Sequence, residues 1–442
     1  MLRVEKVVVS VYRGFLLWGA SILFASASIA QTPSMTNDMP PEIKSWRDEF
    51  LPQDRYAELA DEWRAYSTTH PESAVARVQL ARALRYARTA SPEEIDALID
   101  TAYEIDPRCP EALAELSYRA YVMGWGEEFL DQLEVGRRQS LEAIEIAPNW
   151  AYPYFGLWNM CVLLGRHDEA KRHLEAILDK GAYPATIVDF GYNLLVSARP
   201  NAIVFTNGDN DTYPPLAVQA KHGICRDVAI VNLSLLNRLE YATQVWKARD
   251  GSAPMSDDEI RTLYSRWEAD PGEMSFAKVL MLAILDQSKK DGWETPIYFA
   301  STVSPQYLEV CPYALRIEGL LLRVTRDPKP DEDDAETAID SDRTLTLYRT
   351  AFRMDSATDL SSNWGPRSPA RRLMQNYAAI LRSVASEAAR KGNLEEVRYA
   401  LGEAIRLLDF SGESEMASSL AKYWKEVDPD APPVDRRSTK FR

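Results

Sequence analysis

Residues 202–233 read AIVFTNGDNDTYPPLAVQAKHGICRDVAIVNL, and this stretch decides the fold of the second half of the chain. The nearly all-apolar runs 202–206 and 227–233 each predict a buried parallel strand. Between them, 207–212 reads as a turn, and Pro214 and Pro215 suit the first turn of a helix that stops at Gly223. Strand, helix and strand in this order predict a β-α-β unit with a right-handed crossover.

Two further apolar runs extend this unit. Residues 296–300 predict a third strand, preceded by a helix over about 275–289, and 320–324 predict a fourth. The sequence therefore predicts a small α/β domain over residues 199–326, Rossmann-like and with a mostly parallel sheet.

Polar side chains follow three of these strands at the point where each ends. Ligands of open parallel sheets bind outside the carboxyl ends of the strands, so we expect a ligand-binding edge there. Turns and helix caps use the same residue types, so a purely structural role stays open. The candidate ligand-binding residues are Asn207, Asp209, Asn210, Asp211, Thr212, Asn232, Asn237, Ser301 and Thr302.

Asp209, Asn210 and Asp211 also match the DxD pattern of nucleotide-sugar glycosyltransferases, in which two carboxylates hold a divalent cation against a diphosphate. Such enzymes need a nucleotide-binding half upstream of the motif. The upstream chain here is helical, and Gly208 begins no phosphate-cradling loop. Metal-dependent glycosyl transfer is therefore kept as the alternative function, with no catalytic residue assigned.

The first half of the chain contains an internal repeat. Residues 102–107 (AYEIDP) are echoed 41 residues later by 143–148 (AIEIAP), and a third unit runs over 151–184. In that unit Gly165 permits a turn between paired helices, and Ala170 is small where they cross. The pattern resembles the tetratricopeptide repeat, whose unit is about 34 residues, so residues near 125–134 should form an extended loop or a lengthened helix. We expect helical repeats over 55–198, beginning with a less regular helix near 55–66.

Aromatic residues recur at helical spacing in these repeats. They could line a groove for a partner peptide, or they could pack in the core. They are Trp63, Tyr66, Tyr118, Tyr121, Trp150, Tyr154 and Trp158.

The N-terminus predicts export. Arg3, Lys6 and Arg13 precede an apolar stretch over 14–30 that closes with small residues, which is typical of a signal peptide over 1–30. Cleavage could follow Ala30 or Ala27, and an uncleaved anchor is the alternative. We expect a periplasmic or extracellular bacterial protein with a linker over 31–54 and no stable membrane span after cleavage.

Length and charge set broader limits. A chain of 442 residues has room for two to four domains, and its net charge of −15 disfavours a nucleic-acid partner. Four cysteines far apart in the sequence predict free thiols, and neither they nor the four histidines show metal-type spacing. We expect no metal site and no cofactor.

The last third predicts an acidic loop over 327–342 and then helices. Residues 369–391 and 394–408 predict a helical hairpin joined by a turn at 392–393, and 413–427 predict a last helix within a C-terminal helical region over 343–428. The tail over 429–442 is expected to be disordered.

Four stretches together resemble one family: 203–236, 295–304 (TPIYFASTVS), 315–324 (LRIEGLLLRV) and 371–377 (RRLMQNY). In this order they are similar to the soluble C-terminal module of protein O-mannosyltransferase-like membrane proteins, a domain of unknown function. Pro215 departs from that family's pattern. The family's transferase chemistry is expected in a membrane portion upstream, where this chain has helical repeats instead. The matching residues are Asn207, Gly208, Asp209, Asn210, Asp211, Thr212, Glu318 and Gly319.

The sequence thus predicts an exported, non-enzymatic scaffold with a mixed fold: all-α repeats, a small α/β domain and a C-terminal helical hairpin. The repeats would bind protein partners. The α/β module could hold a glycan or peptide, or join a glycosyltransferase complex.

Overall fold

The computed structural model describes residues 39–433, apart from 125, 127, 249–252, 331–336 and 359–367. The predicted signal peptide and most of the predicted tail lie outside these residues. Along the described part of the chain, no helix combines the length and apolar character needed to cross a bilayer.

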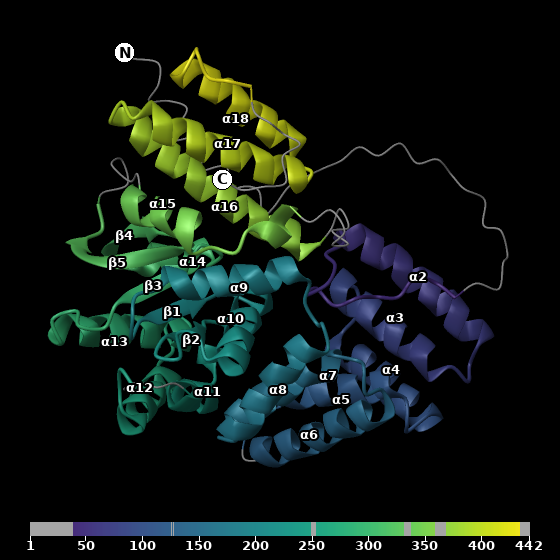
Figure 1. Ribbon diagram of the computed structural model, residues 1–442. Coiled ribbons are helices and arrows are strands. Elements are labelled where there is room, and N and C mark those ends of the chain that lie inside the picture. Colours follow the sequence, from purple (N-terminus) through teal and green to yellow (C-terminus); the bar gives the residue numbers. More distant parts are fainter. Residues whose placement is uncertain are drawn as a thin grey trace.

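The first half is built from consecutive helical pairs, which confirms the predicted repeats (Figure 1). Each pair packs along its length, and Gly165 takes a positive φ of 70° in the turn of the third pair. An additional helix, α2 (Gln53–Thr69), packs on the first pair, and α9 (Ala185–Ser197) follows the third. The pairs are α3 (Ala74–Ala87) with α4 (Pro92–Ile105), α5 (Pro110–Met123) with α6 (Phe129–Ile146), and α7 (Tyr152–Leu163) with α8 (His167–Asp179).

The long spacing of the second unit has two sources. The connection between α5 and α6 runs from 124 to 128, and α6 is 18 residues long against 14 for α4. Gly136 lies where these helices cross, and a Cβ there would meet the Cβ of Ala120 at 2.7 Å. Both a loop and a lengthened helix therefore contribute, as the sequence predicted.

The sheet has strand order β2-β1-β3-β5-β4-β6 and is mixed. The three predicted parallel strands are confirmed as β1 (Ile203–Thr206), β2 (Ala229–Asn232) and β3 (Ile297–Ala300). The predicted fourth strand is β5 (Leu321–Pro328), and it runs antiparallel to β3. A tight turn at Gly319, with φ of 62°, folds β5 back on β4 (Tyr313–Glu318) and imposes this direction. Strands β4 and β6 run parallel to β3, so β5 alone runs against the others. The described sheet is therefore mixed but mostly parallel, as predicted, and it does not confirm a Rossmann-like arrangement.

Helix α10 (Asp209–His222) begins earlier than the sequence predicted. The expected turn over 209–212 is its first turn, because the Asp211 carboxylate accepts hydrogen bonds from the backbone N–H groups of Asn207 and Gly208, both at 2.8 Å. The helix ends at Gly223 in a left-handed conformation, as predicted.

Short elements complete the α/β region. They are the 3₁₀ turn at Leu235–Asn237, α11 (Leu239–Gln244), α12 (Asp257–Ala269), α13 (Phe276–Lys290), α14 (Pro305–Val310) and β6 (Ala338–Ile339). Helix α13 confirms the helix predicted before the third strand.

Four helices follow the sheet, and the last three lie above it in Figure 1. These last three match the three predicted C-terminal helices closely, and each of the four packs on the next. The predicted acidic loop is shorter than expected, because β5 extends to Pro328 and β6 begins at Ala338; residues 331–336 lie outside the described part. The helices are α15 (Ser341–Thr350), α16 (Pro369–Arg390), α17 (Leu394–Phe410) and α18 (Ser414–Val427).

One continuous hydrophobic core runs from α6 to α18, so the repeats and the α/β region share it. A second core joins α2, α3 and α4. The shared core depends on the approach of α10 to α9, where a Cβ on Gly191 would lie 2.7 Å from atoms of Pro214 and Pro215.

Gly191→Ala is expected to lower the free energy of unfolding by about 1–3 kcal/mol, because the added methyl group overlaps the backbone of α10. Chemical denaturation measures this change. Gly402→Ala is the matched control, since its Cβ would meet no atom closer than 3.9 Å. That variant should be unchanged or more stable, and equal destabilisation of both variants would contradict the account.

Candidate functional site

The structure brings the predicted residues together at one edge of the sheet, where their side chains largely bond to one another. Asp211 is 3% exposed and accepts two backbone hydrogen bonds and a third from the Thr302 hydroxyl. Burial raises the pKa of Asp211, and these hydrogen bonds act in the opposite direction. The amide of Asn207 accepts from the backbone N–H of Ser304 at 3.2 Å. Hydrogen bonds therefore connect the loops after β1 and β3.

Hydrogen bonds also connect the end of β2 to the loop after β1. Asn232 donates to the Thr212 hydroxyl at 3.0 Å and accepts from the N–H of Leu235 at 3.0 Å. Asn237 accepts from the N–H of Ala277 at 3.1 Å and so satisfies the start of α13. Of the predicted residues, only Asn210 and Ser301 have a buried side-chain oxygen without a hydrogen-bond partner among the described residues.

The DxD pair does not present two free carboxylates. Asp211 is occupied as a helix cap, and Asp209 forms an ion pair with Arg47 at 2.6 Å. A cation held by both would have to break these contacts. The three strand ends thus lie at one edge, and most of their polar side chains are held by contacts within the protein. Ligand binding at this edge stays a prediction.

Asp211→Ala is expected to cost about 2 kcal/mol of unfolding free energy, because it leaves two backbone N–H groups and a hydroxyl without their acceptor. Asn210→Ala should change stability by less than about 0.5 kcal/mol, since the oxygen it removes has no partner among the described residues. Thermal or denaturant unfolding compares the two. Equal costs would show that the carboxylate is not the cap.

Arg47 belongs to a segment that the sequence assigned to a linker. The stretch 39–51 packs across the repeats: the Ile43 N–H donates to Gln79 of α3 at 2.7 Å, and the Trp46 ring stacks on Tyr86 at 4.7 Å. Ile43 is 1% exposed. The segment, which makes a turn at 45–49, therefore packs against the helices and is not a free linker.

The Arg47 guanidinium lies over the Phe155 ring at 4.1 Å and the Tyr152 ring at 5.1 Å, both on α7. Burial lowers the pKa of Arg47, but the Asp209 carboxylate and neighbouring tyrosines outweigh it, so the net shift is upward. Arg47 stays charged and connects the repeats to the start of α10.

The surface under this segment is charged and aromatic. Glu115 of α5 is fully buried between Arg82 and Arg85 of α3, at 2.6 and 2.7 Å. Burial raises the pKa of Glu115, but the two arginines outweigh it and hold the pKa below its usual value. Arg82 also lies over Tyr152 at 5.2 Å.

Beside Arg47 is a small cavity with room for about one water molecule. We use the term repeat groove for the part of α3 and α7 that the segment 39–51 covers, together with Arg82 and Glu115, which are buried beneath it. The cavity is lined by Arg47, Ala114, Ser117, Tyr118, Tyr121, Ser140, Tyr152, Pro153 and Gly156.

The aromatic residues singled out in the sequence divide between two uses. Trp63 and Trp158 are buried in the cores, at 1% and 4% exposure, whereas Tyr118 and Tyr121 line the cavity. Neither Arg47 nor Arg82 is apparent as a functional residue from the sequence pattern. Arg82 and Glu115 are 33 residues apart, which is close to one repeat length. This spacing of opposite charges on the first helices of neighbouring pairs could have indicated their ion pair.

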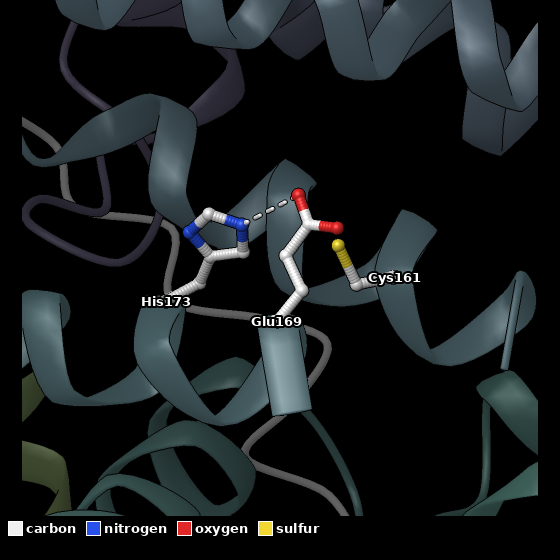
Figure 2. A group of neighbouring side chains, drawn as sticks. All are labelled: Cys161, Glu169 and His173. Atoms are coloured by element: carbon white, nitrogen blue, oxygen red, sulfur yellow. Dashed lines mark ion pairs between the residues drawn. The ribbon is translucent and has the colours of Figure 1, made fainter. Parts of the chain in front are cut away.

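Cys161, Glu169 and His173 come together between α7 and α8, and Figure 2 shows Glu169 between the other two. Thiol, carboxylate and imidazole are zinc-type donors. Glu169, however, already pairs with Arg137 at 2.8 Å and with Arg166 at 3.5 Å. Burial, followed by the Glu169 charge, raises the pKa of Cys161 to about 12, so its thiol is protonated at neutral pH. The Glu169 carboxylate is therefore occupied by ion pairs, and the Cys161 thiol is protonated, so both groups serve the packing of α7 on α8.

All four cysteines are free, as predicted; Cys225 is partly exposed and the other three are buried.

A family model described as TMEM260-associated domain 2 matches residues 187–266, which run from the start of α9 through β1, α10, β2 and α11 into α12. This match contains the first stretch on which the resemblance was based. The relation to O-mannosyltransferase-like proteins stays a prediction.

The crystal structure of yeast Tom70 is among the similar solved structures, at 12% identity and a TM-score of 0.25. The alignment covers 86% of this chain and 61% of the Tom70 chain, so the chain spans about three fifths of that protein's length. A TM-score this low supports no conclusion about function. None of the curated proteins compared matches the chain.

Proposed function

We propose that this protein is an exported, non-enzymatic scaffold whose repeat groove binds a short peptide segment of a partner protein. The observation that carries this proposal is the segment 39–51, which lies on the groove as such a peptide would. It offers an aromatic ring, Trp46, to Tyr86 and a guanidinium, Arg47, to the rings of α7.

Two contacts of this segment are partly open to solvent, although Ile43 is buried. Trp46 is 37% exposed although it stacks on Tyr86. The Arg47 ion pair involves an Asp209 side chain that is 43% exposed, so solvent can compete for it. A partner peptide that carries an aromatic residue next to an arginine would meet the same surface.

Of the other parts of the proposal, export and a glycosyltransferase complex rest on sequence, and a ligand at the α/β edge rests on two buried oxygens. Export rests on the basic start and apolar stretch of residues 1–30. A glycan or peptide bound at the α/β edge would use Asn210 and Ser301, whose buried oxygens are without a partner among the described residues. A glycosyltransferase complex rests on the family resemblance alone, and no observation favours the enzyme alternative.

A labelled synthetic peptide of residues 39–51 tests the groove. In the full-length protein, Trp46→Ala with Arg47→Ala weakens the internal segment, which otherwise competes at a high effective concentration. The double variant is expected to bind the peptide at least about ten times more tightly than the wild type. Fluorescence anisotropy measures both affinities.

Tyr152→Ala, added to the double variant, should abolish peptide binding because it removes the ring beneath two guanidinium groups. Tyr154→Ala is the matched control, since this tyrosine of the same helix packs near His173 and not in the groove. Circular dichroism confirms that each variant is folded. Equal binding to all variants, or to none, would refute the groove as a peptide site.

A further inference from the structure

Three arginines surround one buried glutamate, away from the repeat groove. Glu318, at the end of β4, is fully buried. Its oxygens accept from Arg199 in two contacts of 3.2 Å, and from Arg323 at 3.1 Å. Arg343 Nε lies 3.4 Å from the same carboxylate. The Tyr298 hydroxyl donates to it at 3.0 Å.

The fold brings these residues together from five places in the chain. Tyr298 of β3 and Arg323 of β5 are paired in register, so their side chains share a face of the sheet. Arg343 lies in the first turn of α15, where its Nη2 donates to the carbonyl of Ser197 at 3.0 Å. Arg199 lies in the connection between α9 and β1. The guanidinium groups are thus held by structure on several sides.

The charges of this cluster do not balance. Three arginines face one carboxylate, which leaves a surplus of two positive charges among the described residues. Asp340 caps α15 by accepting from the N–H of Arg343, but it forms no ion pair with the three guanidinium groups. One guanidinium balances the charge of one carboxylate, so two of the three positive charges exceed what Glu318 balances.

The surplus is accessible to solvent. The side chains of Arg199, Arg323 and Arg343 are 39%, 34% and 30% exposed, whereas Glu318 is not exposed at all. Arg323 donates to the Glu318 carboxylate through Nη1, so its Nε and Nη2 lie outside this hydrogen bond. A guanidinium presents five donors in a fixed plane, which suits the oxygens of phosphate and sulfate groups.

We propose that Arg199, Arg323 and Arg343 form a binding site for a small oxyanion of the phosphate type, with Glu318 as the residue that positions the three guanidinium groups. The ligand would add its oxygens on the solvent side and balance the surplus charge. This site is independent of the repeat groove, and the failure of either proposal leaves the other intact.

Titration of the full-length protein with inorganic phosphate at constant ionic strength tests the site. Saturable binding by calorimetry is expected, and Arg323→Gln should weaken it at least about ten-fold. Arg326→Gln is the matched control: it removes the same charge from the same strand, and its guanidinium donates to the Gly292 carbonyl outside the cluster. Equal loss in both variants, or no saturable binding to the wild type, would overturn the proposal.

The variant Glu318→Gln distinguishes the proposed binding site from a network that serves only stability. A structural network predicts lower stability and no phosphate binding. The proposed site predicts lower stability together with phosphate affinity raised about three-fold or more, because the surplus rises from two charges to three. If that variant does not fold, Arg199→Gln provides the second test, with the same expected loss as Arg323→Gln.

A phosphate group can be free in solution or part of a lipid headgroup. Sedimentation with vesicles of phosphatidylglycerol in phosphatidylcholine distinguishes these sources. Vesicle binding that Arg323→Gln abolishes assigns a lipid phosphate, and binding of inorganic phosphate without vesicle binding assigns a soluble ligand. Either result supports the site. Vesicle binding that Arg326→Gln reduces equally would contradict it.

Discussion

The structure depends on the close packing of α10 against the last repeat helices. Gly191 lets the backbone of α10 approach α9, and Tyr213 extends from α10 into α7. There its hydroxyl accepts from Asn159 at 2.6 Å, and its ring meets Phe155 and Trp158 edge-on. The first helix of the α/β region therefore packs as though it were the next helix of the solenoid. For this reason a single core runs from α6 to the C-terminal helices.

This packing also fixes the position of the groove relative to the sheet. Because α10 is held against α7, its N-terminus places Asp209 within reach of Arg47, which already lies over the rings of α7. The segment 39–51 thus contacts the repeats and the α/β region at once. A partner that displaced this segment would break the contact between Arg47 and Asp209, and so would act on both parts of the molecule.

The features that depend on short stretches of sequence could be predicted from the sequence alone. The helical pairs follow from apolar spacing, Gly165 and the repeated Pro after each second helix, and the parallel strands follow from their short apolar runs. The end of α10 at Gly223 could also be predicted from the sequence. The direction of β5 could not be predicted, because it depends on a two-residue turn at Gly319 and not on the composition of the strand.

The candidate site was predicted in part. Parallel topology correctly brought the loops after β1, β2 and β3 together, since strand order places their carboxyl ends at one edge. The sequence could not show that Asp211 caps its own helix or that Asp209 pairs with a residue 162 positions earlier. Arg47 was missed because its partners are distant in sequence and its own segment has no periodic pattern.

The most direct test of the account is hydrogen exchange at the Ile43 amide, which donates to Gln79. If the segment 39–51 is a bound ligand of the groove, this amide should exchange through a local opening, at least about 100 times faster than the core amides of α3 and α7. Exchange of Ile43 at the same rate as those core amides would show that the segment opens only when the whole protein unfolds. That result would contradict the claim that the groove binds an exchangeable peptide.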